Sequence, residues 1–442
     1  MRLIQTIKNI FKIEDLRARL IYTFGIILLY RLGKYITLPG IDPSQLAGLK
    51  NQTSSGIMGL LDMFSGGAFS QASIFALGIM PYISASIVVQ LLGIVFPYFQ
   101  KLQKEGESGR RKMNQYTRYL TIAVLVLQAP TYLVNLSAQL PASAFVMPTF
   151  FFKFSSVVIL TAGTMFVMWL GEKITDKGIG NGISLIIMIG IVARMPANFI
   201  FETGTRMNGA GGAVALIVEI LFLFIVVLGV ILLVQGTRRV PVQYARRIVG
   251  NKQYGGVRQY IPLKVNAAGV MPIIFAQAIM MLPMIIAGYS NSGSGFIVAF
   301  SNMYGFLYNM VTGLLIIVFT YFYTAITINP VQMAEDMKKN GGFIPGIKPG
   351  RKTVEFLDTI MSRITFPGSV FLAMVAILPS VAVKSGVTPQ FAQFYGGTSL
   401  LILVGVILDT LQQIESHLLM RHYDGLMKSG RIKGRSGSVT SI

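Results

Sequence analysis

Two ionisable side chains stand inside long apolar stretches and have the clearest potential for chemistry in this sequence. Glu219 lies within residues 213–235, and Asp409 lies within 396–418. An ionisable group inside a membrane-spanning helix is costly and therefore usually functional, most often in ion or proton coupling. The two residues support one hypothesis, an ion-coupled secondary transporter, although neither has an obvious partner near the middle of a membrane.

The sequence has few residues that are suited to other kinds of chemistry. The chain has no cysteine, which excludes disulfides and thiol catalysis, and only two histidines, His417 and His422. A spacing of five does not place two side chains on one helical face, so we expect solvated interfacial histidines rather than metal ligands. No phosphate-binding glycine–lysine loop is present. We expect neither an enzyme nor a bound metal or cofactor.

The elements that position these residues are long apolar helices. Hydrophobic residues make up 53% of the 442 residues and charged residues only 12%, about half the share in soluble domains. Apolar runs of about 20 residues, long enough to cross a bilayer, recur along the chain. The sequence predicts an all-α polytopic membrane protein with ten spans near 17–36, 76–98, 116–137, 151–172, 183–204, 213–235, 265–288, 304–328, 365–383 and 396–418.

The distribution of positive charge predicts the orientation of these spans. Of the 38 Lys and Arg residues, 31 fall on one side of the predicted topology, which places both termini in the cytoplasm. Five spans on each side of 205–212 suggest two inverted halves. We therefore divide the chain into a cytoplasmic amphipathic segment 1–16, an N-terminal half 17–204, a C-terminal half 205–418 and a cytoplasmic tail 419–442.

Two predicted cytoplasmic loops, 236–264 and 329–364, stand out by length and charge. The first has seven basic residues, among them Arg238, Arg239, Arg246 and Arg247, and no acidic residue. This excess would suit a polyanionic partner such as ribosomal RNA or an acidic protein surface, and the alternative is that the charges only set the topology. The second contains GGFIPGIKPG at 341–350, which predicts a defined turn.

Several segments of the chain resemble the SecY family, the channel-forming subunit of the bacterial Sec protein translocase. They follow the family's order along nearly the whole chain: PGID at 39–42, MFSGGAFSQASIFALGIMPYISASI at 63–87, KEGESGRRKMNQYTRY at 104–119, GTMFVMWLGEKITDKGIGNGISLII at 163–187, PLKVNAAGVMPIIFA at 262–276, FYTAITINP at 322–330, GFIPGIKPG at 342–350 and FYGGTSLLILVGVILD at 394–409.

The resemblance implies a protein-conducting channel that translocates unfolded preproteins and releases transmembrane segments sideways into lipid. It implies an hourglass pore between two five-helix halves in the bacterial cytoplasmic membrane. The implied partners are SecE and SecG in the membrane, and the SecA motor or a translating ribosome at the cytoplasmic face. A transporter remains the main alternative, and an insertase or scaffold without a pore is the second.

The family's pore ring would match six isoleucines: Ile83, Ile87, Ile183, Ile187, Ile274 and Ile402. The first two pairs are spaced i, i+4, so each pair projects from one helical face. Branched apolar side chains have few rotamers and exclude water, which suits a seal against ions. Ordinary helix packing is the alternative. Gln90, Gln128 and Gln277 are candidates for a lateral gate, as weak reversible hydrogen-bonding groups, but they could equally pack elsewhere.

Residues 63–75 would match the family's plug, a short helix beneath the ring that moves aside during transport. The small residues of this stretch, followed by Gly78 and Pro81, read poorly as part of one span. The plug would comprise Phe64, Ser65, Gly66, Gly67, Ala68, Phe69, Ser70, Gln71, Ala72 and Ser73. We expect mobility because little apolar area anchors it. A static re-entrant helix is the alternative.

Two positions depart from the family's pattern. Relatives can carry Arg where this chain has Gln71, so charge is not expected to hold the plug. The family usually has Arg where this chain has Lys348, in a motif associated with the SecA motor. Lysine keeps the charge but loses the planar fork that grips a carboxylate in two places. Our hypothesis is that Lys348 still serves the motor or the ribosome. Asn181, within GIGNG at 178–182, would fix a turn or line the cytoplasmic funnel.

Overall fold

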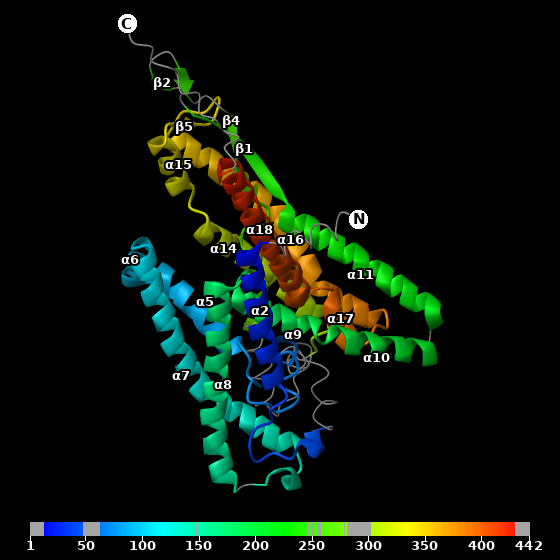
Figure 1. Ribbon diagram of the computed structural model, residues 1–442. Coiled ribbons are helices and arrows are strands. Elements are labelled where there is room, and N and C mark those ends of the chain that lie inside the picture. Colours follow the sequence, from blue (N-terminus) through cyan, green and yellow to red (C-terminus); the bar gives the residue numbers. More distant parts are fainter. Residues whose placement is uncertain are drawn as a thin grey trace. The chain divides into compact units, whose positions relative to one another are not determined.

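A computed structural model shows the arrangement of the helices (Figure 1). It describes residues 13–46, 62–146, 148–209, 211–244, 247–249, 252–254, 258–277, 279–280 and 302–428. The chain divides into two compact units. The first contains Met1–Thr53, Leu60–Ala193 and Val406–Ile442, and the second contains Ser54–Gly59 and Arg194–Gly405. Most of the predicted segment 1–16 and the tail beyond residue 428 lie outside the described residues.

Helices build the first unit. They are α2 (Glu14–Gly33), α5 (Met80–Val95), α6 (Pro97–Lys104), α7 (Glu107–Gln139), α8 (Thr149–Lys177), α9 (Gly182–Val192) and the later part of α18 (Gly397–Lys428), with short 3₁₀ turns at Pro43–Leu46 and Ala142–Ala144. Helix α7 packs against α5 and α8, and α8 also packs against α9 and α2. This group surrounds the irregular segment 62–79.

The second unit begins with the hairpin of α10 (Met195–Asn208) and α11 (Gly212–Gln235). Residues 271–277 are helical. They are followed by α14 (Phe306–Thr327), α15 (Pro330–Lys339), α16 (Arg351–Lys384), α17 (Pro389–Ala392), a 3₁₀ turn at Gln393–Tyr395 and the start of α18. The packing of α14 against α16 is the largest helix contact in this unit.

A small sheet completes the second unit and was not part of the all-α prediction. Strands β1 (Thr237–Tyr244) and β4 (Arg258–Lys264) pair antiparallel, with Thr237 opposite Lys264, and β1 also pairs with β5 (Gly342–Phe343). A separate hairpin joins β2 (Arg247–Val249) and β3 (Lys252–Tyr254). Buried side chains of the sheet and of α15 and α16 form one apolar cluster: Val240, Val242, Leu263, Met337, Ile344, Leu357 and Met361.

Helical residues overlap all ten predicted spans, and in the range 265–288, which is described only to residue 280, they are residues 271–277 and 279–280. Within the described residues, seven helices are long and apolar enough to cross a membrane, or up to eight if the bent pair at 80–103 is one span. Helix α2 carries Arg17, Arg19 and Arg31 and is not among the seven. The predicted non-helical turn at 341–350 is confirmed, because α15 ends before it and α16 begins after it.

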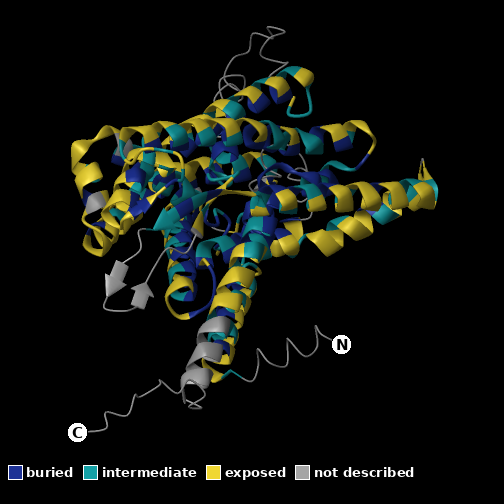
Figure 2. Ribbon diagram, turned by 90° about the horizontal axis from the view of Figure 1, so that it is seen from above, coloured by how far each residue is buried: buried dark blue, intermediate teal, exposed yellow. Residues whose placement is uncertain are grey.

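The surface of the long helices is apolar where it is exposed. Figure 2 shows exposed residues along much of their length. On α11 these include Val214, Ile217, Leu221 and Phe224, each more than half exposed. Water would penalise such a surface and lipid tails would not. The chain is therefore a multi-pass membrane protein.

Candidate functional site

The segment 62–79 is the most unusual part of the first unit, because it is irregular and yet buried. It is helical only at 62–64 and then runs through consecutive turns to 79. The prediction of a short helix over 63–75 is therefore wrong in this respect. Gly66, Gly67 and Ala72 adopt positive φ angles, which an α-helix does not tolerate, and glycine and serine favour turns over helix.

Backbone hydrogen bonds tie this segment to the chain that follows α2. The amide of Leu38 donates to the carbonyl of Ala72 (2.9 Å), and the amide of Ile74 donates to the carbonyl of Ile36 (3.0 Å). Between these two bonds, Thr37 and Ser73 face each other across an antiparallel bridge. The segment is therefore joined to the chain by a short piece of two-stranded pairing.

Side chains from two surrounding helices add hydrogen bonds to its carbonyl groups. Tyr30 of α2 donates to the carbonyl of Ser65 (3.2 Å), and Tyr132 of α7 donates to the carbonyl of Phe69 (3.0 Å). The guanidinium of Arg31 approaches the carbonyl of Gly66 at 3.4 Å. Inside the segment, the buried carboxylate of Asp62 accepts from the amide of Ser70 (2.8 Å). These bonds satisfy polar groups that burial would otherwise leave exposed to an apolar environment.

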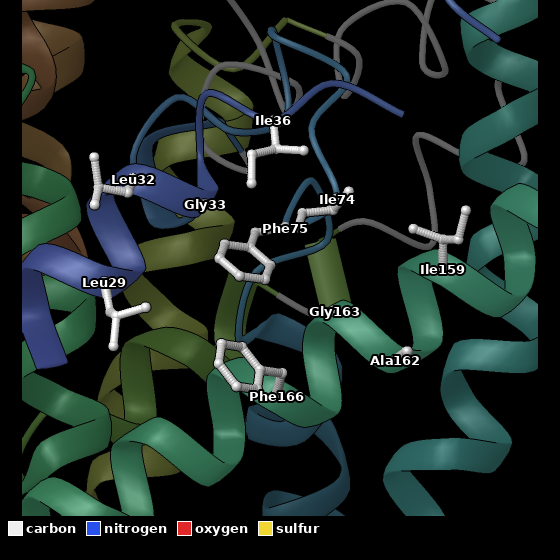
Figure 3. A pocket seen from close by; sticks show the side chains of 10 residues that line it. All are labelled: Leu29, Leu32, Gly33, Ile36, Ile74, Phe75, Ile159, Ala162, Gly163 and Phe166. Carbon is white, nitrogen blue, oxygen red and sulfur yellow. The ribbon is translucent and has the colours of Figure 1, made fainter. Parts of the chain in front are cut away.

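Two glycines let neighbouring helices approach the segment closely. A Cβ on Gly163 of α8 would lie 2.1 Å from the carbonyl oxygen of Ile74, and one on Gly66 would lie 2.9 Å from the Cα of Gly190 in α9. Figure 3 shows Phe75 above Phe166, beside Gly33 and Gly163. Together with side chains of α2 and α8, they line an apolar pocket of about 400 Å³.

The segment has more apolar contact than the sequence led us to expect. Phe64, Phe69 and Phe75 are only 7%, 6% and 3% exposed, and the ring of Phe69 packs edge-on against Tyr132. The expectation that little apolar area anchors the stretch is therefore wrong. Any movement of the segment would have to separate these contacts.

The six predicted ring isoleucines belong to both units. In the first, Ile87 and Ile187 are buried, and Ile83 and Ile183 are half-buried. Ile183 packs closely against Gly171 of α8, which is the helix packing that we kept as the alternative for this residue. Ile274 and Ile402, half-buried and buried, lie in the second unit. The ring stays a prediction.

The three predicted gate glutamines also belong to different units. Gln90 of α5 donates to the hydroxyl of Ser86 on the same helix (3.3 Å), and Gln128 of α7 is exposed. Gln277 is half-buried in the second unit. Their assignment to a lateral gate likewise stays a prediction.

The glycine-rich loop 178–182 forms a turn held by three parts of the first unit. Asn181 caps α9, since its side chain accepts from the amide of Ser184 (3.2 Å). The hydroxyl of Thr23 on α2 accepts from Ile179, and Gln413 on α18 accepts from Gly180 at 2.8 Å. Of the two readings of Asn181, the structure supports the turn. Nothing in the sequence pointed to Thr23 or Gln413.

The predicted docking residues lie on the small sheet and its turn. Arg238 and Arg239 are exposed on β1, and Lys348 is exposed in the turn before α16. Arg247 is in β2, and Arg246 lies outside the described residues. The side chains of Arg238, Arg239 and Lys348 are therefore accessible to a partner.

The two residues that motivated the transporter hypothesis differ in their surroundings. Asp409 is exposed on α18. Glu219 of α11, for which we saw no partner in the sequence, forms an ion pair with Arg206 of α10, and Arg206 also pairs with Glu202 (3.2 Å). The partner comes from the preceding helix of the hairpin, so its distance along the chain concealed it. Glu219 has the surroundings of a structural ion pair.

The carboxylate of Glu202 links this cluster to the chain that follows α16. It accepts from the amide of Thr388 (3.0 Å) and from its hydroxyl. The hydroxyl of Tyr395 donates to the backbone carbonyl of Glu219 (3.0 Å). We call Glu202, Arg206, Glu219, Thr388 and Tyr395 the Arg206 cluster, which fixes the α10–α11 hairpin to residues 386–396.

Comparisons with known proteins bear on the chain as a whole. The SecY family model matches residues 73–411. The protein translocase subunit SecY of Corynebacterium glutamicum is 45% identical over 95% of this chain and 98% of its own length.

Solved structures share the fold at low sequence identity. One, described as the structure of a protein conducting channel, has a TM-score of 0.59 at 18% identity and covers 90% of this chain and 92% of its own. A second concerns the plug domain of SecY, which is said there to stabilise the closed channel and maintain a membrane seal (TM-score 0.58, 17% identity, 90% and 92% covered). A third is Sec61 in the canine ribosome–channel complex (TM-score 0.54, 17% identity, 90% and 92% covered).

The apolar spans, the fold and these matches define a protein-conducting membrane channel. The chain belongs to the SecY family. It is a protein-translocation channel and not an enzyme. The transporter alternative finds no support.

Proposed function

We propose that this channel carries unfolded preproteins across the bacterial cytoplasmic membrane, with both of its termini in the cytoplasm. The observation that carries the proposal is the buried segment 62–79, seated among α2, α7, α8 and α9 directly before α5. Helix α5 bears Ile83 and Ile87. A removable segment next to a water-excluding constriction would let one channel be closed when idle and open during transport.

In this proposal residues 64–73 act as the plug and the six isoleucines act as the ring. The plug's contacts are mainly neutral hydrogen bonds and apolar packing. The net contribution of each hydrogen bond to stability is only about 1 kcal/mol. Contacts with a bound preprotein could therefore replace these hydrogen bonds. Release of apolar segments into lipid would use Gln90, Gln128 and Gln277 as weak latches of a lateral gate.

The proposed partners are SecE and SecG within the membrane and SecA or a ribosome at the cytoplasmic face. Arg238, Arg239, Arg246, Arg247 and Lys348 would contact ribosomal RNA or an acidic surface of the motor. Two observations support this. Arg238, Arg239 and Lys348 are exposed, and a related fold was solved as Sec61 in a ribosome–channel complex.

A reversible disulfide tests the movement of the plug. Residues that face each other across an antiparallel bridge have Cα atoms about 4.5–5.5 Å apart, which lies within the range for a disulfide. The double variant Thr37→Cys with Ser73→Cys should therefore crosslink the plug to the strand after α2. The chain has no other cysteine, so only this bond can form.

We expect SecA-driven transport into vesicles to fall at least tenfold on oxidation and to recover on reduction. The control is Ile41→Cys with Phe145→Cys, a second isolated bridge that does not involve the plug, and its oxidation should leave transport unchanged. If the oxidised protein, with the 37–73 disulfide fully formed, transports as fast as the protein with free thiols, plug movement is disproved.

A further inference from the structure

Two chain segments in the second unit enclose a crevice whose lining is apolar in part and carries several polar side chains. Residues 321, 324 and 325 of α14 and Ile328 directly after it recur at the spacing of one helical face, and residues 358, 361, 362 and 365 of α16 do the same. These faces line a cavity of about 210 Å³. Four of its side chains carry hydroxyl groups: Tyr321, Thr324, Ser362 and Thr365. One carboxylate, Asp358, lies on the same lining.

The chemistry of this crevice favours a ligand that donates hydrogen bonds. A carboxylate only accepts, and the hydroxyl hydrogen of Thr365 is already used, because it donates to the carbonyl of Met361 (2.8 Å). Two basic residues of the same helix end are engaged elsewhere, because Arg351 and Lys352 pair with Glu355 at 3.5 Å and 3.2 Å, and Arg363 does not belong to the lining. An ammonium group would match the acceptors that remain.

The crevice lies where the apolar part of both helices ends. Helix α14 stops at Thr327, just past Tyr321 and Thr324, and the apolar predicted span on α16 begins near residue 365. Exposed apolar side chains continue from the crevice along the two helices, among them Val318, Phe322 and Phe366, which are 53%, 47% and 59% exposed. A ligand with a polar head and an apolar tail would find a surface for each part.

We propose that this crevice binds a phospholipid whose headgroup carries a primary ammonium. Asp358 and Thr365 accept hydrogen bonds from the ammonium, and Tyr321 and Ser362 donate their hydroxyl hydrogens to the phosphate. The acyl chains follow the apolar surface of Val318, Phe322 and Phe366. A quaternary ammonium has no N–H to donate, and a headgroup without a cation leaves Asp358 unmatched. The site therefore selects among lipids by headgroup.

Native mass spectrometry of the purified full chain, titrated with lipids of identical acyl chains, tests this selection. The lipids are phosphatidylethanolamine, phosphatidylcholine and phosphatidylglycerol. Asp358→Asn should weaken phosphatidylethanolamine binding about tenfold, the loss of one charge-assisted hydrogen bond, and leave phosphatidylcholine unchanged. Tyr321→Phe should weaken binding of all three lipids by a smaller factor. Asp336→Asn makes the same charge change at an exposed position of α15 outside the crevice, and should have no effect on any of them.

Three outcomes would overturn the proposal. One is equal affinity of the wild type for all three headgroups. Another is unchanged phosphatidylethanolamine affinity in Asp358→Asn. The third is loss of a co-purifying protein from that variant with lipid binding intact, which would assign the crevice to a basic side chain of a partner. If Asp358→Asn does not fold, Ser362→Ala provides a second test. Its affinity for phosphatidylethanolamine should be about threefold lower than that of the wild type.

Discussion

Two segments of the molecule, the irregular residues 62–79 in the first unit and residues 386–396 with two short helical turns in the second, are held in place by different means. The first is held by tyrosine hydroxyls on backbone carbonyls, by a short β bridge and by close glycine contacts. The second is held by the Arg206 cluster, in which two carboxylates share one guanidinium. One attachment is mainly neutral and the other is ionic.

The difference determines how readily each segment can leave its place. Separating neutral hydrogen bonds costs about 1 kcal/mol each, because water or a substrate can replace them. Separating a buried ion pair leaves an uncompensated charge, which costs several kcal/mol per ion. The glutamates and the arginine of the cluster are at most 12% exposed in their side chains. We therefore expect the attachment of residues 386–396 to be harder to break than that of residues 62–79.

Removing the arginine should give the largest effect. Arg206→Gln leaves Glu202 and Glu219 without their cation, and we expect a loss of about 3–5 kcal/mol in the free energy of unfolding. The measurement is denaturant unfolding of the purified chain in detergent. The same variant should leave the accessibility of the 62–79 segment unchanged under native conditions.

Glu219→Gln provides the matched control, because it leaves one carboxylate for one guanidinium. We expect it to cost clearly less than Arg206→Gln. Arg206→Lys should fall between them, since an ammonium lacks the fork that reaches two carboxylates. Equal losses for Arg206→Gln and Glu219→Gln would show that charge balance does not explain the attachment.

A methyl group at Gly163 should loosen the other segment. In Gly163→Ala the new Cβ would overlap the carbonyl of Ile74, and overpacking of this kind costs about 2 kcal/mol. If the segment opens locally, this raises the open fraction about 30-fold. Maleimide labelling of Ser70→Cys, a buried position in a chain without other cysteines, measures the opening.

Gly25→Ala is the control for this substitution, because a Cβ at Gly25 of α2 meets no atom within 4 Å. Combined with Ser70→Cys, it should give the same labelling rate as Ser70→Cys alone. A fast rate in both variants would indicate general loosening of the first unit rather than loss of one close contact.

Two tyrosines allow the same chemical change in both regions. Tyr132→Phe removes the bond to the carbonyl of Phe69 and should raise Ser70→Cys labelling about fivefold, which corresponds to about 1 kcal/mol. Tyr395→Phe removes the bond to the carbonyl of Glu219. It should lower stability by a similar amount without changing the labelling. Faster labelling in Tyr395→Phe would contradict the independence of the two segments.

The sequence predicted the parts of this fold that follow from apolar length and from turn residues. Runs of about 20 apolar residues predicted ten ranges that all contain helical residues, and the glycines and prolines of 341–350 predicted the turn before α16. Both signals are local. They depend on lipid solubility and on backbone conformation, which a short stretch of sequence determines by itself.

The parts that were missed depend on contacts between distant residues. Strands β1 and β4 are rich in charge, and only the burial of Val240, Val242 and Leu263 against α15 and α16 gives them an inner face. The partner of Glu219 stands across a hairpin, at Arg206. The glycines and serines at 63–75 favour turns over helix, but the particular turns depend on the close approach of the neighbouring glycines of α8 and α9.

An exposed carboxylate in the first unit should give the smallest effect and a different dependence on pH. The backbone amide and then the hydroxyl of Ser44 donate to Asp42, at 3.0 Å and 2.8 Å, and hold the pKa of this carboxyl below its usual range. A lowered pKa means that the folded state favours the ionised form. The resulting stability is present above the unfolded pKa of about 3.9 and is lost as the pH falls through the folded value. Asp42→Asn should therefore lower the unfolding temperature slightly at pH 7, and the difference from wild type should shrink below about pH 4. If the difference in unfolding temperature between Asp42→Asn and wild type stays constant with pH, Asp42 stabilises the fold through the shape of its side chain and not through its charge. Among the carboxylates compared in the two units, only those of the Arg206 cluster would then contribute through their charge.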